Sequence, residues 1–132
     1  MAGLKIFVVD DEQPIADLLS DYLRKDHNEV ETFYEAQSVL KRADQSLPDV
    51  LIADIAMPEM SGIALAEALR ERRQDCKVVL ISGNPEWGCP ENLRGDGAGK
   101  FVLLLKPFKV SQLLHLVRAW HNAASEPAIF AA

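Results

Sequence analysis

Five short apolar runs recur along the 132 residues, and apolar residues return at helical spacing in the polar segments between them. Four runs are nearly continuous Val, Ile, Leu or Phe, which is typical of parallel strands covered on both faces. In the second run the apolar residues Val30 and Phe33 are interspersed with acidic residues, which favours a strand at the edge of a sheet. The predicted strands are residues 4–9, 29–33, 49–54, 77–82 and 101–105.

Helical periodicity fills the segments between these strands. One helix is predicted after Pro14, because a first helical turn accepts proline, and a second runs from near Ala36 to just before Pro48. Two more are predicted after Ser61, a residue suited to cap a helix, and after Ser111. This alternation predicts an α/β fold, with a doubly wound, five-stranded parallel sheet and right-handed crossovers.

The segment between the fourth and fifth strands breaks the pattern. Residues 83–99 hold five glycines and two prolines, and both residue types disfavour a helix interior. Only residues 90–94 can form a helical turn or two, so we predict a short or irregular fourth helix. Residues 124–132 show no periodicity and are expected to be a C-terminal tail or linker stub, which leaves residues 1–123 as one domain.

The charge and the hydropathy of the chain argue against nucleic acid and membranes as binding partners. The formal net charge is −6, which argues against a surface for nucleic acid, since such a surface needs clustered Lys and Arg. No apolar run approaches the roughly 20 residues of a membrane span. The N-terminal run meets acids too early to be a signal peptide. We therefore expect a cytoplasmic protein that binds neither nucleic acid nor membrane.

Charged and polar residues follow the four predicted central strands. Ligands of an open parallel sheet bind beyond the carboxyl ends of its strands, so these residues should meet at one edge. The first strand leads into an acidic pair, the third ends in an aspartate, the fourth in a hydroxyl and the fifth in a lysine. The residues are Asp10, Asp11, Asp54, Ser82 and Lys106.

Three clustered carboxylates repel one another unless a cation lies among them. Mg²⁺ is the natural candidate, because it takes oxygen ligands and favours one or two carboxylates together with a phosphate. A carboxylate beside Mg²⁺ can attack phosphorus to give an aspartyl phosphate, and Lys106 can balance the developing negative charge. Ser82 can donate a hydrogen bond to a phosphoryl oxygen. A cis bond between Lys106 and Pro107 would aim the lysine side chain.

Four segments resemble the receiver domains of two-component response regulators, and the resemblance covers residues 4–121. The fold that it implies is the flavodoxin-like sheet of order 2-1-3-4-5, with the first and last helices on one face. The most specific segment pairs an aspartate with Met and Pro shortly after it and a glycine eight positions on. The segments are VVDDE (8–12), DIAMPEMSG (54–62), LISG (80–83) and LLKPF (104–108).

The resemblance also implies a role for each of these residues. Asp54 matches the phosphoacceptor, Lys106 the phosphate-binding lysine and Ser82 the switch hydroxyl. Mg²⁺ would be bound by Asp54, by the acidic pair, with Asp11 as the likelier direct ligand, and by the backbone carbonyl of Ala56. The metal ligands are thus expected to be Asp10, Asp11, Asp54 and Ala56.

Family behaviour gives the expected function. A sensor histidine kinase or phosphotransfer protein supplies the phosphoryl group, and the receiver catalyses only its own phosphorylation and dephosphorylation. Phosphorylation then remodels a face that a downstream protein or output domain reads, and it can drive dimerisation. The chain is therefore expected to be a signalling module, either alone or as part of a longer regulator, and not an enzyme acting on other substrates.

Two positions depart from the family pattern. The aromatic residue that usually lies three positions before the lysine is replaced by Leu103, which plain strand alternation puts on the same face as Phe101. Ala56 has no polar side chain to position an attacking water, which would affect the lifetime of the phosphoryl group.

Three other readings compete with a phosphorylated receiver. A pseudo-receiver would be an interaction domain that never carries phosphate; the intact acidic pair, Asp54, Ser82 and Lys106 argue against it. A phosphatase of the haloacid dehalogenase type would need a DxD pattern after the first strand, where this chain reads DDEQP. A flavodoxin would need a Ser-, Thr- and Gly-rich phosphate loop at that place, and acids there repel phosphate.

Overall fold

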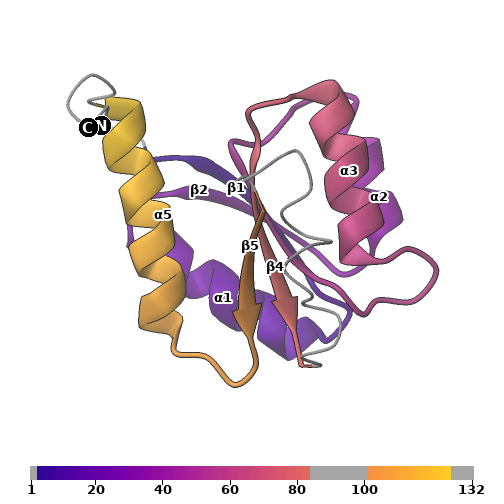
Figure 1. Cartoon of the computed structure of the whole chain (residues 1–132), viewed down its shortest axis with the longest axis horizontal. Coiled ribbons are helices and arrows are strands. Elements are labelled where there is room, and N and C mark those ends of the chain that lie inside the picture. Colours follow the sequence, from indigo (N-terminus) through magenta and orange to yellow (C-terminus); the bar gives the residue numbers. More distant parts are fainter. Residues whose placement is uncertain (1–2, 84–100, 126–132) are drawn as a thin grey trace.

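The computed structural model describes residues 3–83 and 101–125 and is built on a five-stranded parallel sheet (Figure 1). Its strand order, β2-β1-β3-β4-β5, confirms the predicted flavodoxin-like topology. All five predicted strands are present, and two of them begin one residue later than expected. The strands are β1 (Lys5–Val9), β2 (Glu29–Phe33), β3 (Val50–Asp54), β4 (Lys77–Ser82) and β5 (Phe101–Leu105).

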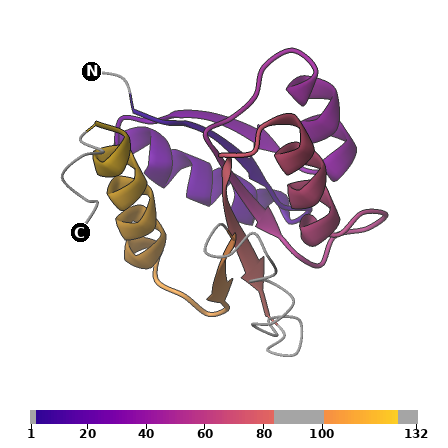
Figure 2. The ribbon, with the colours of Figure 1, turned by 45° about the horizontal axis from the view of Figure 1, so that its top comes forward.

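Helices cover both faces of the sheet. Figures 1 and 2 show α2 and α3 on one face and α1 and α5 on the other, as the predicted fold requires. Within the described ranges, none of the helices is long and apolar enough to span a bilayer. The predicted short fourth helix, in residues 83–99, falls almost wholly outside the described residues. The described helices are α1 (Gln13–Lys25), α2 (Ala36–Ala43), α3 (Gly62–Arg72) and α5 (Val110–Ser125).

Two apolar layers hold the helices to the sheet, and strand alternation divides the residues between them. In β3, Leu51 and Ala53 pack in the layer under α2 and α3, whereas Val50 and Ile52 pack in the layer under α1 and α5. Every residue of β3 is buried, which explains its unbroken apolar run. Only one residue of β2, Val30, is buried, in agreement with its predicted edge position.

Side-chain capping bonds mark the starts of α3 and α5. The hydroxyl of Ser61 accepts a hydrogen bond from the Ala64 amide at 3.1 Å, so its predicted capping role is confirmed. Helix α5 begins at Val110, so Ser111 lies inside its first turn and does not precede the helix. The Gln112 side chain instead accepts from the Lys109 amide at 2.9 Å, which is half of a capping box.

The free edge of β2 is covered by side chains. The Arg24 guanidinium donates to the carbonyl oxygen of Val30 at 3.0 Å and to the hydroxyl of Thr32 at 3.2 Å. The Thr32 hydroxyl in turn donates to Ser20, a buried residue of α1, at 2.7 Å. These bonds tie the edge strand to α1.

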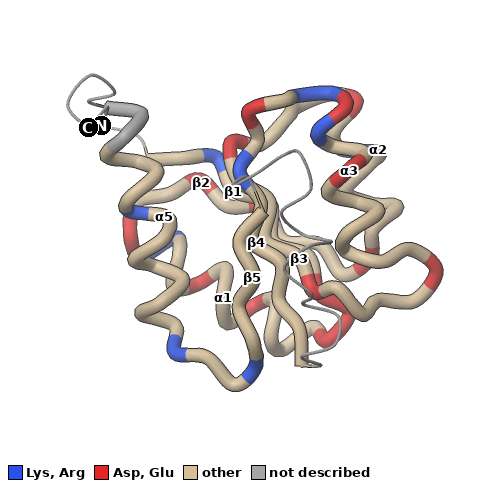
Figure 3. The backbone as a smooth tube through the Cα atoms, viewed as in Figure 1, with Lys and Arg blue, Asp and Glu red and all other residues tan. Residues whose placement is uncertain are grey.

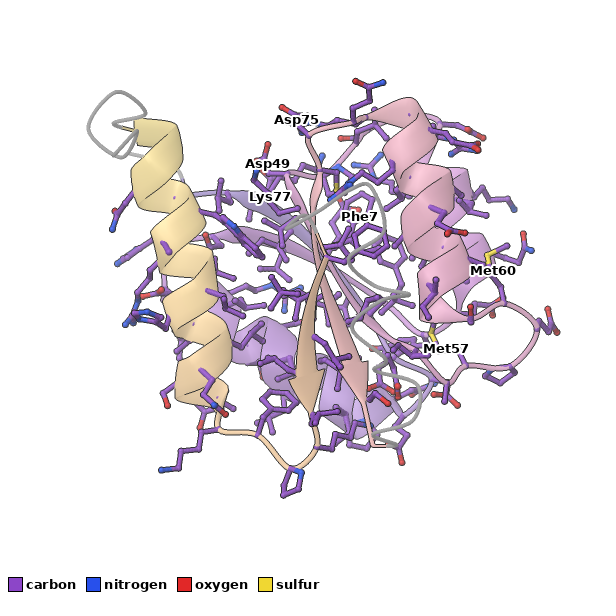
Figure 4. All side chains as sticks on the ribbon, viewed as in Figure 1. Phe7, Asp49, Met57, Met60, Asp75 and Lys77 are labelled. Carbon is purple, nitrogen blue, oxygen red and sulfur yellow. The ribbon has the colours of Figure 1, made fainter. Side chains whose placement is uncertain are left out.

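A second group of charges lies at the opposite end of the sheet from the residues predicted to carry function. Asp49, Asp75 and Lys77 lie together near the amino ends of β3 and β4 (Figure 4). Arg73 bonds to the carboxylates of Asp49 and Asp75, both at 2.9 Å, and to the carbonyl of Pro48 at 3.0 Å. This network anchors the end of α3 to the start of β3 and leaves the carboxyl ends of the strands for the site.

Candidate functional site

The carboxyl ends of the four central strands meet at one edge of the sheet. Asp10 follows β1, Asp54 ends β3, Ser82 ends β4 and Lys106 follows β5. Figure 3 shows acidic positions gathered near these strand ends and basic positions just beyond β5. The residues that the sequence predicted to converge therefore come from neighbouring strands, in the order β1-β3-β4-β5.

Asp54 is buried at the base of this edge, with 6% of its surface exposed. One carboxylate oxygen, Oδ1, accepts from the Ala56 amide at 3.2 Å, and Oδ2 lies 3.3 Å from the Lys106 amine. Behind it, Gly62 packs so closely that a Cβ atom there would lie 2.4 Å from the Asp54 carbonyl oxygen. The start of α3 thus fixes the backbone that carries the Asp54 carboxylate.

Asp10 is the most deeply buried acid of the site, with 1% of its surface exposed. Its Oδ1 accepts from the Glu12 amide at 2.9 Å, but its Oδ2 is buried and has no hydrogen-bond partner. Burial raises the pKa of this carboxyl to about 6; the Glu12 amide opposes the rise, and the negative charge of Asp54 adds to it. A buried, unpaired carboxylate oxygen is the kind of atom that a bound cation satisfies.

Glu12 joins the acidic cluster, and sequence reasoning did not assign it a role. One carboxylate oxygen from each of Asp10, Glu12 and Asp54 lies within 4.8 Å of the others. Asp11, the predicted direct ligand, is exposed and is not in that group, so its role stays a prediction. The signal for Glu12 was present in the sequence as a third acid in the run DDE.

Lys106 provides positive charge beside these acids. Its amine lies 3.3 Å from Asp54 Oδ2 and 3.9 Å from Glu12 Oε1. Partial burial would lower the pKa of Lys106, but attraction to Asp54, Asp10 and Glu12 outweighs it and raises the pKa above its ordinary value. The amine is therefore fully charged at neutral pH. The Lys106–Pro107 peptide bond is cis, as expected from the sequence.

Ser82 and Leu103 complete the surroundings of the lysine. Ser82 is buried, and its carbonyl accepts from the Lys106 amide at 2.8 Å, which joins the ends of β4 and β5. Leu103 and Phe101 both pack against the layer under α2 and α3, so the predicted shared face is confirmed. The aromatic position of the family pattern is thus filled by a partly buried leucine.

The donor set fits a hard divalent cation. Three carboxylates lie together, one buried oxygen among them has no partner, and the backbone of Ala56 runs directly beside Asp54. Oxygen ligands of this kind suit Mg²⁺, which retains several of its waters. The cluster alone would be an ordinary acidic surface; the unpaired Asp10 oxygen is what distinguishes it.

Residues 6–118 match the response regulator receiver domain family, and the chain belongs to that family. Receiver domains are signalling domains of two-component systems; histidine kinases or phosphotransfer proteins phosphorylate them, and they are often joined to output domains. The fold described above is the one that the sequence resemblance implied.

Characterised relatives agree with this assignment. The chain is 32% identical over 114 residues to the response regulator protein TodT of Pseudomonas putida, covering 86% of this chain and 49% of TodT. It is 33% identical over 115 residues to the phosphate regulon transcriptional regulatory protein PhoB of Rhizobium meliloti, covering 87% and 51%. The chain therefore spans about half the length of these relatives.

Solved structures of response regulators are similar to this chain in fold. The response regulator TrrA of Thermotoga maritima, in complex with Mg²⁺ and BeF, matches with a TM-score of 0.74 at 29% identity, over 90% of this chain and 98% of TrrA. The chemotaxis response regulator CheY4 of Vibrio cholerae matches with a TM-score of 0.75 at 27% identity, also over 90% and 98%.

Proposed function

We propose that this chain accepts a phosphoryl group on Asp54 in a Mg²⁺-dependent reaction and uses it to switch a protein-interaction face. The donor is the phosphohistidine of a sensor histidine kinase or phosphotransfer protein. The observation that carries the proposal is the contact of 3.3 Å between Asp54 and Lys106, in a buried site where Asp10 keeps an unpaired oxygen. A nucleophile, a counter-charge and an anionic cation-binding group therefore lie within one strand-end cluster.

The proposed transfer is a single displacement at phosphorus. An Asp54 oxygen forms the new bond to phosphorus, and the bond from phosphorus to the donor nitrogen breaks, with the electron pair leaving on the imidazole. Lys106 balances negative charge on the phosphoryl oxygens, and Ser82 donates a hydrogen bond to one of them. Hydrolysis of the same acyl phosphate by water later returns Asp54 to its carboxylate form.

Mg²⁺ would be held by Asp10, Asp11, Asp54 and the carbonyl of Ala56, and when bound it neutralises phosphoryl charge. The chain's own contribution is to keep carboxylate oxygens of Asp10 and Asp54 close together and the Asp54 carboxylate largely shielded from water. Asp54 is therefore modified as part of a signal, and we propose no chemistry on substrates other than the phosphodonor and the aspartyl phosphate.

The proposed role also implies the extent of the domain, its location and its partners. We propose that residues 1–123 form the receiver domain, that it acts in the cytoplasm, and that a downstream protein or an output domain reads the phosphorylated state. A phosphorylation-dependent dimer is one form that this reading can take. We propose no direct contact of this domain with nucleic acid, because the net charge of −6 on the whole chain opposes one.

The test is phosphorylation by acetyl phosphate with and without Mg²⁺, read by intact mass. Wild type is expected to gain one labile phosphoryl group only when Mg²⁺ is present, and acetate is released. Asp54→Asn is expected to gain none, because its amide lacks the nucleophilic carboxylate oxygen. Circular dichroism of both proteins verifies that the variant is folded.

A pseudo-receiver gives a different result in the same experiment. A folded wild-type protein that gains no phosphoryl group from acetyl phosphate or from phosphoramidate would exclude the proposal. Modification that persists in Asp54→Asn would instead move the acceptor to another residue, which peptide mapping would locate.

The role of Asp11 can be separated from that of the cluster. Because Asp11 is proposed as a direct ligand, Asp11→Asn is expected to weaken Mg²⁺ binding at least tenfold in a calorimetric titration. Asp21→Asn is the matched control, since it removes one charge from the exposed part of α1. Equal Mg²⁺ affinity in Asp11→Asn and the control would exclude Asp11 as a ligand.

A further inference from the structure

Glu12 occupies the position that caps α1, but its side chain does not cap the helix. Its backbone carbonyl accepts from the amides of Ile15 at 3.0 Å and Ala16 at 3.1 Å, while its carboxylate makes no capping hydrogen bond. A side chain at this position ordinarily stabilises the first turn by accepting from free amides. Glutamate is not among the residues that commonly cap a helix in this way, and its carboxylate lies elsewhere.

The carboxylate lies instead at the phosphorylation site. Its Oε1 atom is 3.9 Å from the Lys106 amine, which also lies 3.3 Å from Asp54 Oδ2. One amine is thus shared by two carboxylates that come from different strand ends. Glu12 is 64% exposed and Lys106 32% exposed, so the pair is accessible and can be broken without unfolding the protein.

We propose that Glu12 is a counterion that competes with the incoming phosphoryl group for Lys106, and so sets how tightly the site binds tetrahedral anions. The inference rests on the proposed function, because it assigns a regulator to the same site. Glu12 is a positioning residue here: it acts on the phosphoryl group through Lys106 and through its own negative charge.

Two electrostatic effects predict that the charge of Glu12 weakens the binding of the anion. A phosphoryl group needs Lys106 as a partner, so the contact of Lys106 with Glu12 must be given up when the group arrives. The carboxylate that remains then repels the added negative charge at short range. Exposed ion pairs are weak, so removing the charge should change anion affinity by about two- to fivefold.

The test uses beryllofluoride as the phosphoryl mimic, titrated into the whole chain at saturating Mg²⁺ and followed by amide chemical shifts. Glu12→Gln keeps the size of the side chain and removes its charge. It is expected to bind the mimic about two- to fivefold more tightly than wild type. The gain is expected to shrink in about 1 M salt, because exposed charges are screened there.

Asp21→Asn is the matched control for net charge. Asp21 lies on the same helix with a side chain 66% exposed, nine positions further on, which is about 13 Å along the axis. It is expected to bind beryllofluoride as wild type does. An equal gain in Asp21→Asn and Glu12→Gln would overturn the inference, because the effect would then be one of overall charge.

Other outcomes are equally decisive. Unchanged affinity in Glu12→Gln would show that Glu12 does not compete for Lys106. Weaker binding of the mimic by Glu12→Gln would also overturn the inference, because it would show that Glu12 helps to bind Mg²⁺ and, through Mg²⁺, the anion. In that case a Mg²⁺ titration without beryllofluoride would show the same loss of affinity. If wild type itself fails to bind the mimic, the proposed function fails and this inference fails with it; binding by wild type isolates the role of Glu12.

Discussion

Replacing Asp10 with asparagine is expected to stabilise the metal-free protein, raising the free energy of unfolding by about 2–3 kcal/mol near pH 7.5. Asp10 is almost fully buried, and its Oδ2 has no partner, so its negative charge costs the folded state free energy when no cation is present. Asparagine keeps an oxygen that can accept from the Glu12 amide and removes the charge.

The pH dependence follows from the raised pKa. Burial raises the pKa of Asp10 to about 6 from 3.8 in an unfolded chain. The folded state therefore binds its proton more tightly than the unfolded state does. The stability that protonation confers is fully present below pH 3.8 and is lost as pH rises through about 6. The advantage of Asp10→Asn near pH 5 should consequently fall to about half of its value near pH 7.5.

Urea denaturation in EDTA at these two pH values measures the effect. Asp21→Asn removes an exposed charge and is expected to change the free energy of unfolding by less than about 0.5 kcal/mol. With Mg²⁺ present, wild type should gain stability by mass action and Asp10→Asn should gain much less. A variant that is less stable than wild type in EDTA near pH 7.5 would contradict this account of the buried carboxylate.

Gly62→Ala, which adds one methyl group, is expected to destabilise the protein by about 1–3 kcal/mol and to slow phosphorylation of Asp54 more than tenfold. A Cβ atom there would lie 2.4 Å from the Asp54 carbonyl oxygen and 3.1 Å from the Ile55 Cα atom. Both neighbours are backbone, so the start of α3 or the end of β3 must move. Alanine is the better helix former by about 1 kcal/mol, which reduces the loss without reversing it.

Gly83→Ala is the matched control for this change. Among the described residues, a Cβ atom at Gly83 would meet the flexible Lys106 side chain at 3.9 Å, which is an ordinary contact. Urea midpoints and acetyl phosphate labelling rates of the two variants should therefore separate, with Gly83→Ala close to wild type. Similar rates in both variants would show that the backbone behind Asp54 does not determine its reactivity.

The fold could be read from the sequence because its signals are local and agree with one another. The apolar run of residues 50–53 is typical of a strand buried on both faces, and the acids in β2 favour an edge. Once the strands alternate with helices, the parallel sheet and its functional edge follow from chain topology. The convergence of Asp54 and Lys106, 52 positions apart, needed no further information.

Side-chain direction could not be read in the same way. The run DDE places three acids at one strand end, but the turn into α1 decides which of them lie toward Asp54. The structure turns Asp10 inward, leaves Asp11 exposed and brings Glu12 to Lys106. Helix α5 likewise begins before Ser111 and not after it. The bond between the Gln112 side chain and the Lys109 amide, which marks the start of this helix, is visible only in three dimensions.

An edge strand with free backbone groups can pair with the sheet of a neighbouring molecule unless something blocks it. The hydrogen bond from Arg24 to the Val30 carbonyl occupies an acceptor that a strand of another molecule would need, and it puts a charge in the path of that strand. Intermolecular strand pairing, the route to fibrils, is therefore disfavoured at β2 even though one side of its backbone faces outward. The phosphorylation-dependent association proposed above would therefore use surfaces other than the β2 edge.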